Sequence, residues 1–503
     1  MSALKNLLLN LLLALMLAVV LAGCSKDDNP KADGGALPAE AGGGESGEME
    51  TAEDPRAGAK DSLPDNLDFG GKNLRIMHCE EDIWGYEIDI AEEVGDVVKD
   101  TIYRRNRAVE DRLNIRIQAM PYAGIYTKPL EFFDYVKRSV KSGSGELDLV
   151  AGYGFLSTAL GTEGYYLNWH EVGYVDLDRP WWSADFREQM TYDGKMYFLV
   201  GDIGITLLSK MFCVYFNKQL ASDYDTGNLY QMVLDGDWTL DKMNELSRGI
   251  YSDLNGDGKA DAGDLYGCAI STGNIIDAMY AAFDYRITQK DADGVPQLSM
   301  NSPKMADMVD RVYNFLYNNA GVFSMKEETG GLDVNRKMFT ENRVLFLPDM
   351  VETNETFRAM NTDYGIIPYP KWDKAQKAYH TSVQLALSMF SIPITCADPD
   401  MVGAAAEALC AEGYRKVTPA YFEIALKQKY ARDEESSKML DIIRDGLFFD
   451  FGYMNSYSME GYHNVFRDLM RDKKTDFVSA YEKSEKKYQR ALDKVLGSYE
   501  KNP

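Results

Sequence analysis

The chain has 503 residues, of which 45% are apolar and 12% aromatic. This is enough apolar material for the cores of two or three domains. The formal net charge is −25. A surface of that sign repels nucleic acid and anionic lipid headgroups, so neither is an expected binding partner.

The N-terminal 23 residues have the layout of a secretory signal. Lys5 supplies a positive start, and residues 7–22 form an apolar stretch interrupted only by Asn10. The stretch is short for a membrane span, which needs ~20 apolar residues. Its end, Leu-Ala-Gly-Cys, resembles a bacterial lipobox, which implies cleavage before Cys24 and lipidation of the Cys24 thiol. We expect a lipid-anchored protein on the extracytoplasmic face of the cell membrane. An uncleaved anchor is the alternative.

Residues 24–66 are rich in Gly, Ala, Glu and Asp and contain almost no large apolar side chain. Such a segment cannot bury enough surface to offset the entropy of ordering. We predict a flexible tether that holds a folded body away from the membrane.

The cysteines beyond Cys24 do not form a disulfide framework or a metal-binding pattern, because they are odd in number and widely spaced. They are Cys79, Cys213, Cys268, Cys396 and Cys410. We interpret most of them as small buried apolar residues. The sequence leaves open whether Cys396 and Cys410 form a disulfide bond.

From residue 67 the apolar pattern alternates between strands and helices. Strands are expected at 73–79, 114–119 and 147–152, with helices at 97–113 and 129–142 between them. This order is typical of a parallel sheet with crossover helices. Ligands of such sheets bind beyond the carboxyl ends of the strands, which points to the loops that follow the first and third strands.

The remainder predicts further elements of both kinds. Strands are expected within 191–207, where Asp193-Gly194 is a hairpin signal, and at 211–217, 343–348 and 382–393. Helices are expected within 217–235 and at 238–251, 303–319, 401–415 and 475–499.

Residues 253–264 have the spacing of a calcium-binding loop. Ligands are expected from Asp253, Asn255, Asp257, Lys259 (through its carbonyl), Asp261 and Asp264. Gly258 occupies the sharp turn, but Asp264 stands where the EF-hand consensus has glutamate, and no clear partner helix follows. We predict a structural Ca²⁺ site. The alternative is a polar turn without an ion.

Several aromatic residues fall in predicted loops, some of them at strand ends. They are Trp84, Tyr86, Tyr153, Trp181 and Trp182. Aromatic faces in a cleft suit sugar rings, whose C–H bonds stack on them. The alternative is packing in the core, where most tryptophans lie.

Signals of an enzyme are weak. The four histidines form no HExxH motif, and no GxSxG, GxGxxG or phosphate-binding loop is present. Acidic residues are too numerous for a catalytic pair to stand out. We therefore expect a protein that is not an enzyme.

Taken together, several segments resemble the extracellular solute-binding protein family 1, the substrate-binding lipoproteins of bacterial ABC importers, related in fold to maltose-binding protein. The segments are residues 95–115, 181–203, 214–220, 366–383 and 418–443. The resemblance implies an α/β fold of two lobes, each a mainly parallel sheet flanked by helices, with the ligand between them. Lobe 1 would comprise 67–208 and 382–415, and lobe 2 would comprise 209–381 and 416–503.

The resemblance also implies a set of ligand-contacting residues. They are Glu80, Trp84, Tyr86, Tyr153, Trp181, Trp182, Asp202, Asp349, Met350, Tyr369 and His380. The implied function is capture of a carbohydrate, in particular an oligosaccharide, by a monomer that closes its lobes and delivers the ligand to an ABC permease. The alternatives are a surface lipoprotein that binds glycan or peptide without a transporter, and a polysaccharide-active hydrolase.

Overall fold

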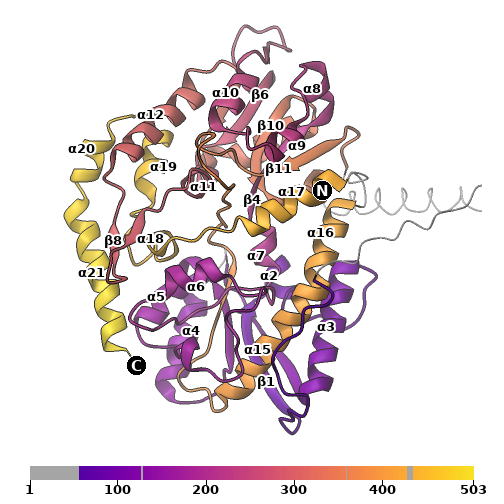
Figure 1. Ribbon diagram of the computed structural model, residues 1–503, viewed down its shortest axis with the longest axis vertical. Helices are drawn as coiled ribbons and strands as arrows, with labels where there is room; N and C mark the ends of the chain where they lie inside the picture. The colour runs from indigo at the N-terminus through magenta and orange to yellow at the C-terminus, as the bar shows by residue number, and fades with distance from the viewer. Residues whose placement is uncertain (1–55, 126–127, 358, 428–433, 503) are drawn as a thin grey trace, which may run out of the picture. The chain divides into compact units, whose positions relative to one another are not determined.

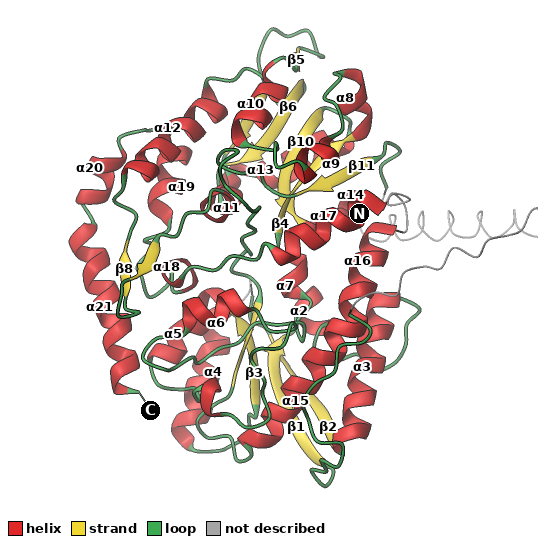
Figure 2. Cartoon of the chain, in the orientation of Figure 1, coloured by secondary structure: helices red, strands yellow, loops and turns green. Residues whose placement is uncertain are grey.

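Two sheets organise the chain in the computed structural model, which describes residues 56–125, 128–357, 359–427 and 434–502 (Figures 1 and 2). All of these residues belong to the unit Asp54–Pro503. The predicted signal, Cys24 and most of the predicted tether lie outside the described residues. Each sheet with its helices is called a lobe below.

The sheet of lobe 1 has the order β12-β3-β1-β2. Its strands are β1 (Lys72–Cys79), β2 (Ile115–Tyr122), β3 (Leu149–Tyr153) and β12 (Ser388–Ser391). β1 pairs in parallel with β2 and β3, whereas β12 runs antiparallel to β3. A strand from late in the chain therefore completes the first sheet.

Helices cover the faces of this sheet. They are α2 (Asp82–Tyr86), α3 (Val97–Leu113), α4 (Pro129–Ser142), α5 (Gly154–Thr162), α6 (Ala184–Met190) and α15 (Pro399–Glu412), with a short 3-10 turn, η1 (Trp169–Glu171). α3 begins where the Asp96 carboxylate accepts from the amides of Val98 and Lys99. It ends at Asn114, whose φ of 49° is left-handed. The predicted helix 97–113 has the same bounds.

The sheet of lobe 2 is mixed, with the order β11-β4-β10-β6-β5 and β9 paired to β6. Its strands are β4 (Phe212–Asn217), β5 (Tyr251–Ser252), β6 (Leu265–Ser271), β9 (Val322–Met325), β10 (Val344–Met350) and β11 (Tyr364–Ile367). β6 runs parallel to β9 and β10, while β4 runs antiparallel to β10 and β11.

Lobe 2 has its own helices and one hairpin. The helices are α8 (Lys218–Asp223), α9 (Leu229–Leu234), α10 (Leu240–Arg248), α11 (Asn274–Ala282), α12 (Pro303–Tyr317), α13 (Gly331–Thr340) and α14 (Asn354–Phe357), with 3-10 turns η2 (Glu327–Thr329) and η3 (Val351–Thr353). The hairpin consists of β7 (Thr288–Lys290) and β8 (Pro296–Leu298).

The chain crosses between the lobes three times. The first crossing includes α7 (Thr206–Ser209), and the second, residues 381–387, runs antiparallel beside it. The amide of Phe212 donates to the carbonyl of Ser382, and the amide of Gln384 donates to that of Lys210. The third crossing is the π-helical turn η4 (Gly413–Val417) between α15 and α16 (Thr418–Lys427).

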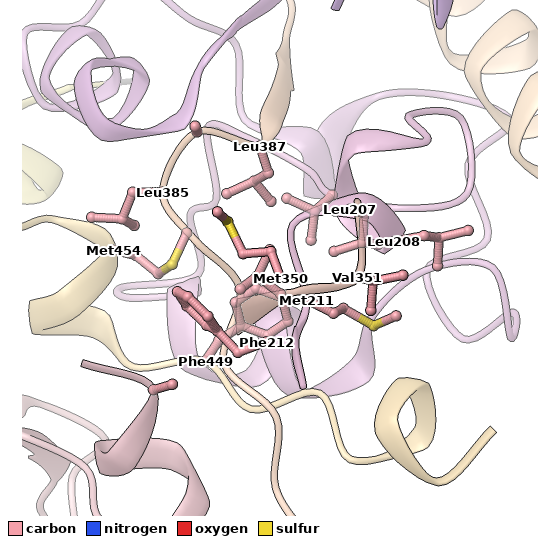
Figure 3. Close-up of a cluster of buried hydrophobic side chains, with 14 of the residues drawn as sticks. Leu207, Leu208, Met211, Phe212, Met350, Val351, Leu385, Leu387, Phe449 and Met454 are labelled. Atoms are coloured by element: carbon pink, nitrogen blue, oxygen red, sulfur yellow. The ribbon is translucent and has the colours of Figure 1, made fainter. Parts of the chain in front are cut away.

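A cluster of buried apolar side chains lies where the first two crossings meet the lobes (Figure 3). Its labelled members are Leu207, Leu208, Met211, Phe212, Met350, Val351, Leu385, Leu387, Phe449 and Met454. Each is less than 10% exposed. The second crossing was expected to be part of a strand at 382–393. It is instead irregular, and β12 begins only at Ser388.

The C-terminal segment contacts both lobes. Its helices are α17 (Glu434–Asp445), α18 (Phe451–Met454), α19 (Asn464–Arg471), α20 (Phe477–Glu482) and α21 (Glu485–Lys501). α21 packs against β8 of lobe 2 and α5 of lobe 1, and Figure 1 shows it, in yellow, beside both. Lys195 donates to the carbonyl of Tyr499 at 2.7 Å. The helix predicted at 475–499 is interrupted at residues 483–484.

The final part of the predicted tether differs from expectation. Asp61 forms an ion pair with Arg112 at 2.7 Å, and Leu63 is 7% exposed. Residues 56–66 are therefore attached to lobe 1, because charge pairing and one apolar anchor offset the cost of ordering them.

All five cysteines in the described ranges are free, so Cys396 and Cys410 are not bonded to each other. Within those ranges, none of the helices combines the length and apolar character that crossing a membrane requires.

Candidate functional site

A pocket of about 540 Å³ lies between the two lobes. Lobe 1 contributes Tyr153 and Phe155, and the second crossing contributes residues 384–386. Lobe 2 and the C-terminal segment contribute Gly273, Asn274, Glu327, Glu328, Tyr453, His463, Asn464, Arg467, Asp468 and Arg471. The pocket is therefore bounded by both lobes and by a segment that joins them.

The pocket lies at the carboxyl ends of strands from both sheets. Tyr153 is the last residue of β3, and Asn274 begins α11 shortly after β6 ends. Glu327 follows β9, the parallel neighbour of β6. This is the edge at which open α/β sheets bind ligands.

Glu327 closes the N-terminus of α11. Its Oε2 accepts from the amide of Asn274 at 2.8 Å. A Cβ on Gly273 would lie 1.6 Å from that oxygen, so the carboxylate can approach the helix only because residue 273 is glycine. The partial positive charge of this helix end is therefore already matched by a carboxylate of the chain.

Aromatic rings form one side of the pocket. Tyr153 and Phe155 line the pocket with their ring centroids 6.0 Å apart. Tyr457 is not itself a lining residue, but its ring meets that of Phe155 edge-on at 5.6 Å. Tyr457 is 48% exposed. Such faces and edges provide apolar contact area for a sugar ring.

The two arginines of the pocket are paired with carboxylates. Arg467 makes a two-point ion pair with the buried Asp277, with 2.9 Å from Nε to Oδ1. Burial alone would lower the pKa of Arg467, but the charge of Asp277 raises it overall. Arg471 lies 2.8 Å from Asp468 and 3.6 Å from Glu328.

His463 is neutral at physiological pH. Burial, reinforced by the charge of Arg467, lowers the pKa of His463 to about 3. Its ring meets Tyr453 edge-on at 5.5 Å. It therefore contributes a polar but uncharged group to the pocket.

Four lining side chains carry a buried polar atom with no hydrogen-bond partner among the residues that the structure describes. These atoms are Asn274 Oδ1, Gln384 Oε1, His463 Nδ1 and Asn464 Oδ1. A buried polar atom without a partner costs about 1–3 kcal/mol. A ligand that donates hydrogen bonds would remove that cost once a side-chain rotation turns the atom toward the pocket.

Of the predicted contact residues, Tyr153 alone is among the residues that line this pocket. Trp84 is 3% exposed and donates to the carbonyl of Ala386 at 2.6 Å, while Lys210 Nζ lies 4.4 Å from its ring. Tyr86 is half-buried beneath Lys99, and Glu80 is exposed after β1. Trp84 therefore stabilises the second crossing through Ala386, which lines the pocket, while Trp84 itself does not.

The paired tryptophans lie inside lobe 1. Trp181 is 1% exposed and packs against Tyr414. Trp182 is 4% exposed and donates to Glu407 at 2.8 Å. Both rings are covered by protein, because they pack against α15 and the turn that follows it. The structure does not bring them to the pocket.

Asp202 lies beside the third crossing. It accepts from Thr418 at 2.9 Å and from Arg444 at 2.7 Å, and it is 4% exposed. A Cβ on Gly413 would lie 2.0 Å from the Asp202 carbonyl oxygen, so the π-helical turn approaches this loop through a glycine. Asp202 connects lobe 1 to the helices beyond the crossing.

The predicted residues of lobe 2 are occupied by other contacts. Asp349 makes a two-point ion pair with Arg336. Met350 belongs to the buried apolar cluster at the first two crossings, called the crossing cluster below (Figure 3). Tyr369 is buried and donates to the carbonyl of Ile275 at 3.2 Å. His380 packs on Phe448, 3.7 Å from Asp284. In this conformation these side chains face protein.

The loop 253–264 is held by its own acidic side chains. Asp253 accepts from the amides of Gly256 and Gly258, and the fully buried Asp264 accepts from Leu254 and Asp261. The oxygen donors of the six predicted ligands are of the kind that Ca²⁺ prefers. Across the described ranges, however, no group of three or more His, Cys, Asp or Glu side chains is disposed to hold a metal ion. The Ca²⁺ site stays a prediction.

Most of the pocket was missed by sequence reasoning. Tyr453 lies in α18, His463 immediately precedes α19, and Arg467 and Arg471 lie in α19, in a stretch that showed no motif. The one available signal was the amphipathic pattern of residues 464–471, whose apolar side chains Val465, Phe466, Leu469 and Met470 are buried. That pattern places the arginines on the opposite side of the helix.

Solved structures share this fold at low sequence identity. A cyclo/maltodextrin-binding protein complexed with maltotetraose has a TM-score of 0.54 and 13% identity, covering 85% of this chain and 96% of its own. The maltose-binding periplasmic protein MalE of Listeria monocytogenes, in complex with maltose, has a TM-score of 0.52 and 11% identity, covering 86% and 99%. The GacH receptor of Streptomyces glaucescens, solved unliganded and with acarbose, has a TM-score of 0.50 and 11% identity, covering 86% and 98%.

These similarities show the fold. The chain has the two-lobed α/β fold of the maltose-binding-protein-like periplasmic binding proteins. No protein-family model matches the sequence. No curated protein matches it either.

Proposed function

We propose that this protein is the extracytoplasmic solute-binding component of an ABC importer, and that it captures a carbohydrate between its lobes without covalent chemistry. The observation that carries the proposal is the pocket of about 540 Å³ at the strand ends of both lobes. It combines aromatic rings with polar atoms that lack partners, which is the combination that a hydroxyl-rich ring requires. Proteins of the same fold have been solved with maltotetraose, maltose and acarbose.

The mechanism follows from the position of the pocket relative to the crossings. A ligand that contacts both Tyr153 in lobe 1 and Asn464 in α19 of the C-terminal segment binds the closed arrangement of the lobes better than an open one, because only the closed arrangement allows both contacts at once. Its binding energy therefore shifts the population of lobe arrangements toward closure. The second crossing carries Gln384 into the pocket, so that ligand contact and hinge position are coupled through one segment.

The test is isothermal titration of the folded body, from residue 56 onward, against a panel of oligosaccharides. Binding of at least one neutral oligosaccharide with a Kd below about 100 μM supports the proposal. If none of a broad panel of sugars and polyols binds, the proposal fails. Two permease genes beside the coding gene would support the importer over a binding protein without a transporter.

We also propose that the protein is lipidated at Cys24 and tethered to the cell membrane. The signal layout and the lipobox-like ending support this, and a diacylated anchor holds a protein stably where one chain does not. Cys24→Ser should release the protein or leave an unprocessed precursor, while the affinity of the folded body stays unchanged. Retention of a processed Cys24→Ser protein in the membrane fraction would contradict lipidation.

A further inference from the structure

The pocket contains three groups that commonly recruit anions, and each is already occupied by a carboxylate of the chain. The amide of Asn274 at the start of α11 donates to Glu327. Arg467 is paired with Asp277, and Arg471 is paired with Asp468 and Glu328. Helix N-termini and arginines are the usual partners of ligand carboxylates, sulfates and phosphates. An incoming anion would therefore have to share each of the three with a carboxylate of the chain.

The charge of the lining points in the same direction. Glu327, Glu328 and Asp468 line the pocket together with only two guanidinium groups, one of which is paired with Asp277 behind it. His463 is neutral at physiological pH. An added anion would therefore meet a net negative surface, and its attraction to either arginine would compete with an existing ion pair.

Three side chains of the lining carry acceptors without partners, which a ligand that donates hydrogen bonds would satisfy once the side chains turn toward it. Asn274, Gln384 and Asn464 each have an unpartnered side-chain oxygen, and these oxygens can only accept. Hydroxyl groups donate, whereas ionised carboxylates and sulfates only accept. An anionic group would supply no donor to these acceptors.

From these contacts we infer that the cleft selects uncharged, hydroxyl-rich glycans and rejects glycans that carry carboxylate, sulfate or phosphate groups. The inference rests on the proposed function and narrows its ligand class. The selectivity for uncharged ligands comes from the paired Arg467 and Arg471 and from the carboxylate at the N-terminus of α11. It does not depend on which neutral sugar fits the pocket best.

The experiment compares matched pairs of probes that differ only at the primary hydroxyl positions, where the oxidised form carries a carboxylate in place of a hydroxyl donor. Maltotriose, cellotriose and mannotriose are titrated beside their forms oxidised at the primary hydroxyl groups to carboxylates. We expect each oxidised form to bind about tenfold more weakly or worse than its neutral parent at low salt. The difference should shrink as ionic strength rises, since salt screens the repulsion. Equal or tighter binding of an oxidised form would overturn the inference and leave carbohydrate capture intact. Failure of all probes, neutral and oxidised, would overturn the proposed function itself.

A pair of variants tests the paired arginine directly. Asp468→Asn removes the nearest partner of Arg471, and the side chain is 48% exposed, so the fold should tolerate the change. We expect the affinity ratio of oxidised to neutral probe to rise at least about threefold. Asp493→Asn on α21 makes the same charge change outside the pocket lining and should leave the ratio unchanged. If the two variants give the same affinity ratio, the ion pair with Asp468 does not prevent Arg471 from binding an anion, and the inference fails.

Discussion

The carboxylate of Asp202 in lobe 1 accepts a hydrogen bond of 2.7 Å from the guanidinium of Arg444, which lies beyond the third crossing. The side chain of Asp202 is 1% exposed and that of Arg444 is 13% exposed. Thr418 donates to the other carboxylate oxygen at 2.9 Å. A residue in a loop of lobe 1 is thus part of the joint between the lobes.

Asp202→Asn should destabilise the protein strongly. The substitution keeps the shape but leaves the guanidinium of Arg444 buried without its counter-charge, which typically costs about 3–5 kcal/mol. Burial raises the pKa of the Asp202 carboxyl despite Arg444, so relief of that desolvation offsets part of the loss. Urea unfolding measures this loss. Asp445→Asn is the matched control. The Asp445 side chain is 76% exposed, and its 3.9 Å ion pair with the same arginine is long and open to solvent. Its effect should therefore stay within about 0.5 kcal/mol. A loss for Asp202→Asn as small as that of the control would show that the ion pair does not hold the joint.

Glu407 should make stability depend on pH. It is fully buried, accepts from Trp182 at 2.8 Å, and has an unpartnered Oε1. Burial raises the pKa of Glu407 from 4.5 to about 7, although the bond from Trp182 opposes this. Because the folded-state pKa is raised, the stability contribution is complete below pH 4.5 and is lost as pH rises through about 7.

Glu407→Gln cannot ionise, so it should unfold less readily than the parent above pH 7. The expected gain at pH 8.5 is about 1–3 kcal/mol, with little difference at pH 4.5. Denaturant unfolding at both pH values measures it. A difference that is the same at the two pH values would show that Glu407 is not the titrating group.

Tyr457 should contribute to ligand binding through its ring. It is 48% exposed, and its ring meets Phe155 of the pocket edge-on. Removing one aromatic contact typically costs about 0.5–1.5 kcal/mol, so Tyr457→Ala should weaken sugar binding about two- to tenfold. Tyr457 does not itself line the pocket but packs on the lining ring of Phe155. Tyr224→Ala is the control, since Tyr224 is 41% exposed and lies on lobe 2 just after α8. Unchanged affinity in Tyr457→Ala would remove this ring from the site.

If loop 253–264 binds Ca²⁺, the ion should raise the melting temperature and a chelator should lower it. Asp257→Asn should abolish the calcium-dependent shift, because it removes one charged ligand at an exposed position. Without calcium, the variant and the parent should melt alike. The absence of any shift in the parent would mean that the loop is a polar turn closed by its own hydrogen bonds.

Local sequence patterns predicted more of the fold than of the binding pocket. Residues 97–113 predicted α3 with its observed bounds, because the helix has a capping residue and a regular apolar face. The strand expected at 382–393 was too long. Leu385 and Leu387 are apolar because they pack in the crossing cluster, so apolar character there does not signal a sheet.

The pocket depends on contacts between segments far apart in sequence, and this limits what the sequence alone can predict. Strand order located Tyr153, because the carboxyl end of β3 is a local feature. Arg467 and His463 enter the pocket only through the packing of α19 on α11 and α12. Trp181 and Trp182 had the composition of a sugar site but pack in the core, since loop position does not determine burial.

Closure of the lobes on a carbohydrate can be measured by small-angle X-ray scattering of the folded body. The protein is measured alone and with saturating amounts of the tightest-binding neutral oligosaccharide from the titration panel. We expect the ligand to decrease the radius of gyration, because the closed arrangement is the one that places Tyr153 and Asn464 on the same ligand. Saturating binding with no change in the radius of gyration would contradict capture by closure.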